Sequence, residues 1–409
     1  MLPVAVNVPV GDDYVVLESV VDLRQAEDAA HFLGVLFATH VGGEHRLVVT
    51  RLLAYAASFL PGGLDLRLLS VVASLSLFAA LLMVGRMLRL EQHWGYWLLL
   101  LLTVLTPQME KLMFYPMAAV QAFLGMLLAV LYLHFVLENG VMWAGLTLLA
   151  GVFTTAGAVA LPVVAAAVLA LRHRWAALVP HVIVGGTIIA VYFTGDAGPR
   201  DGVVAFAVEH PWQTLRLFFG ILGSIAEVPA FRYMSWSAYS TVAVGIGLLA
   251  YSAVLAFRAS NKRVPQDTVE VAALALIGYA IAMIALIAVN RALLYQDAML
   301  AAMLDGRYKL YGLLVAAVCA IDLLRRLEFR RSLPHCAVIV LLGTFVLDVD
   351  WYFYRANHAY AAAQTRLHAM ESWMRTGNTS ELPSWANSPE MAGQALARAT
   401  DAGIFKPRR

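Results

Sequence analysis

The feature that most constrains this chain is the recurrence of apolar runs long enough to cross a lipid bilayer. A helix needs roughly 20 mostly apolar residues for one crossing, and such runs recur along the whole sequence. Hydrophobic residues make up 61% of the 409 positions and charged residues only 14%. That ratio is far beyond what the core of a soluble domain needs. We therefore expect an all-α, polytopic bundle of transmembrane helices.

The apolar runs predict about 10 or 11 membrane segments. Several are short enough to be bent or to cross only part of the bilayer. The ten segments that the sequence delimits are 64–86, 94–106, 113–136, 141–155, 157–171, 176–194, 238–257, 269–289, 307–324 and 334–351.

Arginine-rich turns separate alternate segments, and they predict the orientation in the membrane. These turns are "GRMLRL" with Arg86 and Arg89, "LRHRW" with Arg172 and Arg174, "FRASNKR" at 257–263, and "RRLEFRR" at 325–331. If each segment crosses once, the turns share one side, which the positive-inside rule assigns to the cytoplasm. The other connections, at 1–63, 195–237, 290–306 and 352–409, would then face the periplasm from a bacterial inner membrane.

Three regions follow from this layout. Residues 1–63 form an outer loop with interfacial helices over about 14–38 and 46–60, and Arg46 and Arg51 lie on the second of them. Residues 64–351 form the transmembrane domain, and residues 352–409 form a periplasmic tail that folds as a small outer cap. No run ahead of Asp12 is long enough to be a signal sequence or a crossing. An outward-facing start therefore requires either a further helix upstream of Met1, which we favour, or export of the terminus driven by segment 64–86.

Charged side chains gather on the predicted outer side and form the candidate site. Charges near a membrane are costly unless they pair or act. Carboxylates could serve as a general base, and arginines could hold a phosphate through paired hydrogen bonds. The candidate residues are Asp12, Asp13, Glu44, His45, Arg46, Glu110, Arg291, Arg307, Tyr308 and Lys309.

Structural interpretations of the same residues stay open. The acidic pair Asp12–Asp13 follows Gly11 and could cap a helix N-terminus. The stretch "GGEHR" at 42–46 could be another helix start with its glutamate favoured by the helix dipole. The stretch "GRYK" at 306–309 could be an interfacial collar of long side chains. On the other side, Asp322 lies beside two arginines and is interpreted as structural.

Several function classes are excluded by what the sequence lacks. It has no Walker-type phosphate loop, no GxSxG or HExxH motif, and no Cys/His cluster with metal-ligand spacing. Nucleotide hydrolysis and a thiolate metal site are therefore not encoded. Cys319 and Cys336 lie in apolar segments, so a disulfide framework is not expected. The net charge of +2 gives no indication of a nucleic-acid partner, because the basic residues lie in short clusters between apolar runs, and no such partner is expected.

Four short stretches resemble the GT-C superfamily, the integral-membrane glycosyltransferases that use polyprenyl-phosphate-linked sugars. They are the acidic pair in "GDDY", the "GGEHRLVVTRLL" stretch similar to an NEHR-type motif, "TPQMEKLMFYPMAAVQAFL", and "DGRYKLYGLL" with Arg291 upstream. The layout is similar over most of the chain, but the specific likeness is confined to these stretches. Two departures are Gly43, where many relatives have asparagine, and the lack of a helix before the acidic pair.

The resemblance implies transfer of a sugar, with inversion, from a polyprenyl phosphate to an envelope glycan or a surface protein such as a pilin. It makes Asp12 the general base, and Asp13 would orient the acceptor or bind a divalent cation if one is used. Arg307, Arg291, Arg46 and His45 would hold the donor phosphate, supported by Glu44, Tyr308, Lys309 and Glu110. Membrane lipid would be the other partner, at a groove between helices. No metal-ligand set is assigned, and whether a divalent cation takes part stays open.

Three other functions fit parts of the pattern. A lipid-linked glycan flippase or exporter would also place basic residues at the outer face, but it needs polar groups along a path through the bundle. A glycan polymerase or ligase would use a lipid-pyrophosphate donor and need not depend on Asp12. A structural subunit of an envelope assembly would tolerate Asp12→Asn and Arg307→Ala together.

Overall fold

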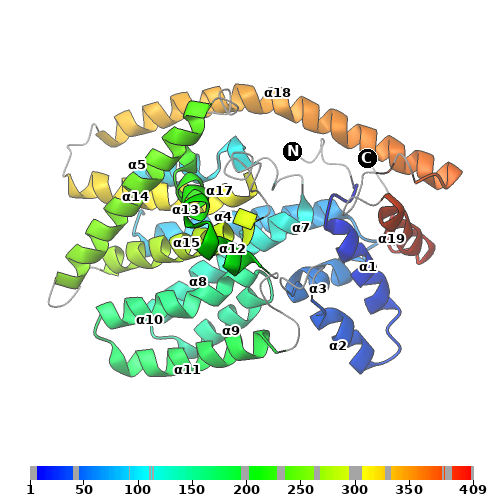
Figure 1. Ribbon diagram of the computed structural model, residues 1–409, viewed down its shortest axis with the longest axis horizontal. Coiled ribbons are helices and arrows are strands. Elements are labelled where there is room, and N and C mark those ends of the chain that lie inside the picture. The colour runs from blue at the N-terminus through cyan, green and yellow to red at the C-terminus, as the bar shows by residue number, and fades with distance from the viewer. Residues whose placement is uncertain are drawn as a thin grey trace.

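The computed structural model describes residues 7–39, 46–91, 93–109, 112, 115–194, 202–227, 235–261, 268–293, 306–327, 333–379, 382 and 389–406. The regular secondary structure of these residues is helical, and the described chain adds only two isolated bridges, Thr39 with Arg46 and Leu64 with Phe405. The all-α prediction is therefore confirmed. Most of the long helices run along the long axis of the molecule, and α1, α2, α3 and α19 gather at one end (Figure 1).

The helices of the amino-terminal half follow the apolar runs closely. Their bounds are α1 Asp13–Arg24, α2 Ala29–Phe37, α3 Val48–Ala57, α4 Leu66–Met87, α5 Trp94–Val104, η1 Pro107–Met109, α7 Pro116–Ala119, the π-helix η2 Val120–Leu124, α8 Gly125–Leu137, α9 Val141–Val152, η3 Ala156–Ala160, α10 Leu161–Leu171 and α11 Trp175–Tyr192.

The carboxyl-terminal half contains the longest helices. Their bounds are α12 Val203–Glu209, α13 Pro211–Leu222, η4 Ser224–Ala226, α14 Ser235–Asn261, α15 Thr268–Ala292, α17 Gly306–Arg326, α18 Leu333–Thr376 and α19 Pro389–Asp401. Helix α18 continues without a break through residue 351, where the sequence places the start of the outer tail. Its 44 residues span about 66 Å, more than twice the thickness of a bilayer core.

Five helices in the described part of the chain are long and apolar enough to cross a membrane. They are Leu66–Met87, Pro116–Leu137, Trp175–Tyr192, Ala238–Asn261 and Thr268–Ala292. Each coincides with one of the predicted segments, so membrane-helix character is supported. Shorter apolar helices at Val48–Ala57, Trp94–Val104, Val141–Val152 and Ala156–Leu171 are below the length of a full crossing. The number of 10 or 11 crossings is not confirmed.

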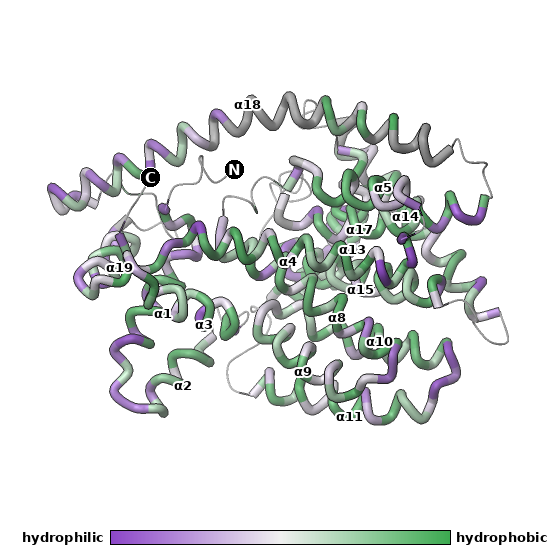
Figure 2. The backbone as a smooth tube through the Cα atoms, turned by 180° about the vertical axis from the view of Figure 1, so that it is seen from behind, coloured by the Kyte–Doolittle hydropathy of each residue, from purple (hydrophilic) through white to green (hydrophobic). Residues whose placement is uncertain are grey.

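The extent of burial shows that α15 is a central helix of the bundle and α11 a peripheral one. In the most apolar stretch of α15, 61% of the residues are buried, whereas in α11 only 17% are. Helix α11 exposes Val179, Val182 and Ile183 although its composition is as apolar as that of a core helix. A helix that is hydrophobic all round and exposed on one side is stable where the surrounding solvent is lipid. Figure 2 shows hydrophobic colouring along the bundle and hydrophilic colouring toward helix ends.

The two ends of the chain meet beside α1. The Asn7 side-chain amide donates to the carbonyls of Leu64 (3.3 Å) and Lys406 (3.1 Å), and its oxygen accepts from the Leu66 amide at 2.8 Å. Arg398 of α19 pairs with Asp22 of α1 at 2.6 Å. These contacts fix the terminal helices to the start of α4, and they place α1 between the bundle and α19.

The arginine-rich turns gather at the opposite end. Arg325 of α17 donates to the carbonyls of Leu88 (2.7 Å) and Arg89 (3.2 Å), and Arg89 donates to the Thr268 hydroxyl at 3.0 Å. These bonds join the ends of α4 and α17 to the start of α15. Across the bundle, Arg174 donates to the Leu137 carbonyl at 3.2 Å. The described residues of the basic turns therefore lie toward one end of the bundle, in agreement with the alternating charge pattern.

Candidate functional site

The acidic pair lies where a tight turn leads into α1. Gly11 has a positive φ of +55°, and a Cβ added there would lie 2.9 Å from the Tyr115 hydroxyl oxygen. Asp12 occupies the N-cap position but makes no side-chain capping hydrogen bond. A capping role for Asp12, the structural alternative suggested by sequence, is thus not what this side chain does. Glycine at position 11 instead allows the turn to pack directly against Tyr115.

Asp13 is completely buried and is held by backbone donors. Its Oδ2 accepts from the Val10 amide at 3.0 Å, and its Oδ1 accepts from the Met117 amide at 3.0 Å. No arginine or lysine in the described residues forms an ion pair with it. Burial raises the pKa of the Asp13 carboxyl to about 7, against the lowering effect of the two amide hydrogen bonds and with a smaller increase from the Asp12 charge.

Asp12 is only partly buried and contacts Tyr115 through both backbone and side chain. Its amide donates to the Tyr115 hydroxyl oxygen at 2.8 Å, and the hydroxyl is also hydrogen-bonded to the Asp12 side chain. Burial, and then the charges of the two aspartates, raise the pKa of Tyr115. The hydroxyl therefore keeps its proton and can orient the Asp12 carboxylate. Of the two acids, Asp12 is the one that an acceptor molecule could reach.

The π-helix directly follows the segment that holds the acidic pair. Residues Val120–Leu124 are wound more widely than the α-helical turns on either side, a feature that often re-aims side chains at functional sites. The Gln121 amide Nε2 within this turn is buried and has no hydrogen-bond partner in the described structure. Sequence reasoning missed Gln121, because a single glutamine in an apolar run gives no signal of a widened turn.

Lys309 lies in a second buried cluster, at the start of α17. Its ammonium group forms an ion pair with the Glu227 carboxylate Oε2 and lies 3.4 Å from the Gln108 Oε1. The Gln108 side-chain amide in turn donates to the Glu227 backbone carbonyl at 3.0 Å. Both charged side chains are fully buried. Lys309 therefore ties α17 to η1 and η4, and its charge is already compensated.

A short segment connects the two clusters. Gln108 contacts Lys309, and Tyr115, seven residues later, contacts Asp12. Seven residues reach at most about 25 Å, so both clusters lie near the same end of the bundle. Glu110, a predicted supporting residue, belongs to this segment but lies outside the described residues, as do Glu44 and His45.

The predicted phosphate-binding arginines are at different places in the structure. The Arg46 guanidinium Nη2 donates to the Thr194 carbonyl, and its Nε is buried without a partner in the described structure. Arg291 is in the last turn of α15 and Arg307 in the first turn of α17, but the placement of the Arg307 side chain is outside the described set. Tyr308, beside it, is 8% exposed.

Arg291 and Arg307 share one end of the bundle. Arg326 pairs with Glu270 at 2.9 Å, and the rings of Tyr279 and Tyr311 are 5.9 Å apart. These contacts require α15 and α17 to be antiparallel. The last turn of α15, with Arg291, therefore lies at the same end as the first turn of α17, with Arg307.

Arg51 is a buried cation that the sequence placed at the membrane interface. It is 3% exposed. Its Nε donates to the Ser19 hydroxyl at 3.1 Å, and its Nη1 donates to the Leu36 carbonyl at 3.1 Å and to the Ala38 carbonyl. Burial lowers the pKa of Arg51 to about 10. The side chain joins α1, α2 and α3, which the apolar spacing of α3 alone did not indicate.

The contacts of Asp13 belong to the turn that precedes α1. The described residues contain no group of three or more His, Cys, Asp or Glu side chains that could hold a metal ion. Both Asp13 oxygens accept backbone N–H bonds. These contacts make Asp13 a fixed support for the turn.

Carboxylates at the arginine-rich end are paired differently. The Asp322 Oδ2 accepts from the Arg326 Nε at 2.6 Å and from the Tyr251 hydroxyl at 2.8 Å. Glu270, 4% exposed, pairs with the other side of the same guanidinium. This network supports the structural interpretation of Asp322.

Comparison with known proteins gives no relative on which to base an identity. No family model matches this chain, and neither a curated protein nor a solved structure does.

Proposed function

We propose that this protein is a GT-C-type glycosyltransferase of the bacterial inner membrane. It would move a sugar from a polyprenyl phosphate to an envelope glycan or surface protein on the periplasmic side. The observation that carries the proposal is the acidic pair: Asp13 is buried with no ion-pair partner among the described residues, and Asp12 beside it is partly accessible and held by Tyr115. This pair lies at the end opposite the basic turns, which the positive-inside rule places in the cytoplasm.

Asp12 acts as the general base in this mechanism. The acceptor hydroxyl has a pKa far above neutrality, so its proton must leave as the new bond forms. Asp12 accepts that proton while the acceptor oxygen bonds to the anomeric carbon of the sugar. The bond from that carbon to the phosphate oxygen breaks, and its electron pair leaves on polyprenyl phosphate. Direct displacement of this kind inverts the anomeric configuration.

The other residues of the site have supporting roles. Asp13 fixes the turn between Val10 and Met117, so that Asp12 faces the acceptor. The leaving phosphate needs charge stabilisation rather than a proton. Arg46, Arg291, Arg307 and His45 are the proposed donors of that stabilisation. Because the Lys309 charge is compensated by Glu227, Lys309 serves this site by positioning α17.

The test is release of free polyprenyl phosphate by purified protein in nanodiscs. The donor is a set of polyprenyl-phospho-sugars, and a crude envelope extract supplies acceptors. Wild type, Asp12→Asn, Asp13→Asn and Arg307→Ala are compared. Asp401→Asn is the matched control, because this carboxylate is exposed at the end of α19. Donor binding is measured separately by native mass spectrometry.

The proposal requires that wild type and Asp401→Asn release polyprenyl phosphate, while Asp12→Asn binds the donor without releasing it. Loss in Asp13→Asn alone would transfer the base role to Asp13. If no form consumes donor, the transferase proposal fails, and movement of lipid-linked glycan across the bilayer becomes the next function to assay. Consumption of a lipid-pyrophosphate donor, independent of Asp12, would favour a polymerase or ligase.

A further inference from the structure

Two arginines in the turn between α10 and α11 converge on the carboxyl-terminal end of α8. The Arg172 Nη1 donates to the Leu137 carbonyl at 3.4 Å, and the Arg174 Nη1 donates to the same oxygen at 3.2 Å. The Arg174 Nη1 also donates to the Asn139 side-chain oxygen at 2.9 Å. Because both guanidinium groups contact one oxygen atom, their two positive charges are held close together.

The charge of this pair is not fully compensated within the described structure. Neither arginine forms an ion pair with a described carboxylate, and Arg174 repels Arg172. The exposed Glu138 attracts Arg172 without forming an ion pair. The described contacts use Nη1, so the Nε–H and Nη2–H donors of both side chains have no partner among the described residues. Two adjacent guanidinium groups with unused donors match the oxygens of a phosphate.

Two exposed tryptophans flank the arginines. Trp175 directly follows Arg174 at the start of α11 and is 58% exposed, and Trp143 in the first turn of α9 is 54% exposed. The hydrogen bond between Arg174 and Asn139 joins the turns that precede these two helices. Tryptophan is enriched at the level of the lipid headgroups. The arginines are therefore at the depth where the phosphate of a phospholipid lies.

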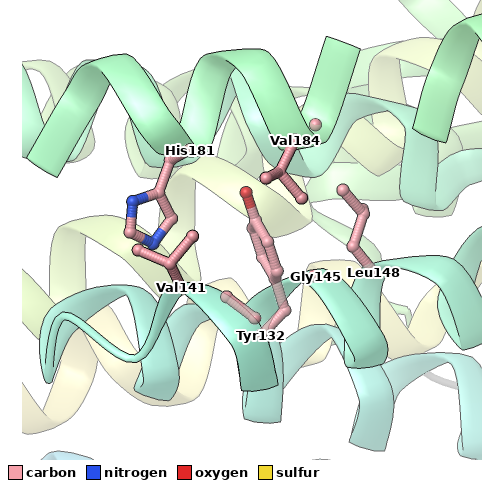
Figure 3. A pocket seen from close by; sticks show the side chains of 8 residues that line it. Tyr132, Val141, Gly145, Leu148, His181 and Val184 are labelled. Carbon is pink, nitrogen blue, oxygen red and sulfur yellow. The ribbon is translucent and has the colours of Figure 1, made fainter. Parts of the chain in front are cut away.

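Apolar side chains continue from the tryptophans toward the middle of the membrane. Helices α9 and α11 both begin at this end and pack against each other, so their later residues lie deeper. Figure 3 shows Tyr132, Val141 and His181 filling the space between α8, α9 and α11, which leaves the exposed sides of these helices for a ligand. The exposed apolar residues there are Met142, Leu146, Leu149, Val179, Val182 and Ile183.

We propose that this surface binds one anionic phospholipid, whose phosphate lies between Arg172 and Arg174. The phosphate oxygens accept from the unused guanidinium donors, and the acyl chains pack along the exposed sides of α9 and α11. The apolar residues below the arginines favour a lipid over a free phosphate, which would leave them uncovered. The site is at the arginine-rich end, away from the acidic pair, and it does not depend on the proposed sugar transfer.

The first experiment uses the wild-type protein alone. Full-length protein in phosphatidylcholine nanodiscs is cross-linked to phosphatidylglycerol or phosphatidylcholine that carries a diazirine on one acyl chain, and mass spectrometry locates the labelled peptides. Phosphatidylglycerol should label peptides of α9 and α11 at least about fivefold more, because its headgroup is anionic. Unlabelled phosphatidylglycerol should compete, whereas inorganic phosphate should not. Equal labelling by the two lipids would overturn the proposal, as would equal competition by inorganic phosphate, which would assign the arginines to a free anion.

The second experiment removes the two charges. Arg172→Gln and Arg174→Gln should each lower phosphatidylglycerol labelling of α9 and α11 about fivefold, with phosphatidylcholine labelling unchanged. Replacing both arginines with lysine keeps the charge and should retain most of the preference, and thermal unfolding checks that each variant is folded. Arg258→Gln is the matched control, because this exposed arginine lies in the last turn of α14, outside the site. Unchanged labelling in both glutamine variants, or an equal loss in Arg258→Gln, would contradict a site built on these two arginines.

Discussion

Buried carboxyl groups occur at both ends of this bundle, but they are stabilised in different ways. At the arginine-rich end, Glu270 and Asp322 share the guanidinium of Arg326. At the other end, Asp13 is fully buried and contacts only backbone amides, with no cation among the described residues. A paired carboxylate stabilises helix packing, whereas a carboxyl without a cation has a raised pKa and marks a candidate for chemistry.

The proposed function requires the acidic end to face outward. We expect an all-or-none difference in labelling by a membrane-impermeant maleimide. With Cys319 and Cys336 replaced by alanine, Asp401→Cys on α19 should be labelled from the periplasm of intact cells. Arg258→Cys, near the end of α14, should be labelled only after the inner membrane is permeabilised. The reverse pattern would place the acidic pair in the cytoplasm and remove the basis for periplasmic transfer.

Removing the shared cation should strongly destabilise the arginine-rich end. Arg326→Met removes the cation that buried Glu270 and half-buried Asp322 share, and we expect the free energy of unfolding to fall by about 2–3 kcal/mol. The loss is below that of a fully buried pair because the Arg326 side chain is 28% exposed. Thermal unfolding in detergent measures it, and exposed Arg375→Met is the control. An unchanged thermal midpoint would mean that the ion pairs of Arg326 contribute little to stability. The carboxyl groups at the two ends would then differ less in how they are stabilised than their contacts indicate.

At the acidic end, loss of the Tyr115 hydroxyl should lower the rate of sugar transfer more than the stability of the protein. Tyr115→Phe removes the contacts to the Asp12 amide and side chain, and we expect kcat to fall about tenfold. Donor binding should be retained, because Tyr115 is a positioning residue for the base. Tyr360→Phe, an exposed position on α18, is the control. Equal losses in kcat and thermal stability would point to a purely structural tyrosine.

Stability should also respond to pH through Asp13. Its folded-state pKa of about 7 exceeds the ordinary value of 3.8, so the folded state binds more protons between these values. The free energy of unfolding should therefore decrease as pH rises from 5 to 8, with a fall in thermal midpoint of about 2–4 °C. Asp13→Asn lacks the titrating group and should show a flatter curve. A wild-type curve parallel to that of Asp13→Asn would refute the raised pKa.

The sequence predicted the membrane helices better than the contacts between them. Apolar runs and arginine-rich turns are local signals, and all five long apolar helices coincide with predicted segments. The pairing of Lys309 with Glu227 joins residues 82 positions apart, and no local pattern links them. The contact between Asp12 and Tyr115 also arises from tertiary packing between residues far apart in sequence. The amphipathic pattern of α3 predicted an interfacial Arg51, yet its contacts with α1 and α2 bury it.

The claim that Asp12 is the general base is tested most directly by neutralising one carboxylate from each end of the bundle. Polyprenyl phosphate release per folded molecule and thermal midpoint are measured for wild type, Asp12→Asn and Asp322→Asn. The account predicts that Asp12→Asn loses at least about a hundredfold in release with little change in midpoint, whereas Asp322→Asn is less stable but releases polyprenyl phosphate at the wild-type rate. Release of polyprenyl phosphate at the wild-type rate by Asp12→Asn, in a preparation where wild type is active, would contradict the assignment of Asp12 as the base.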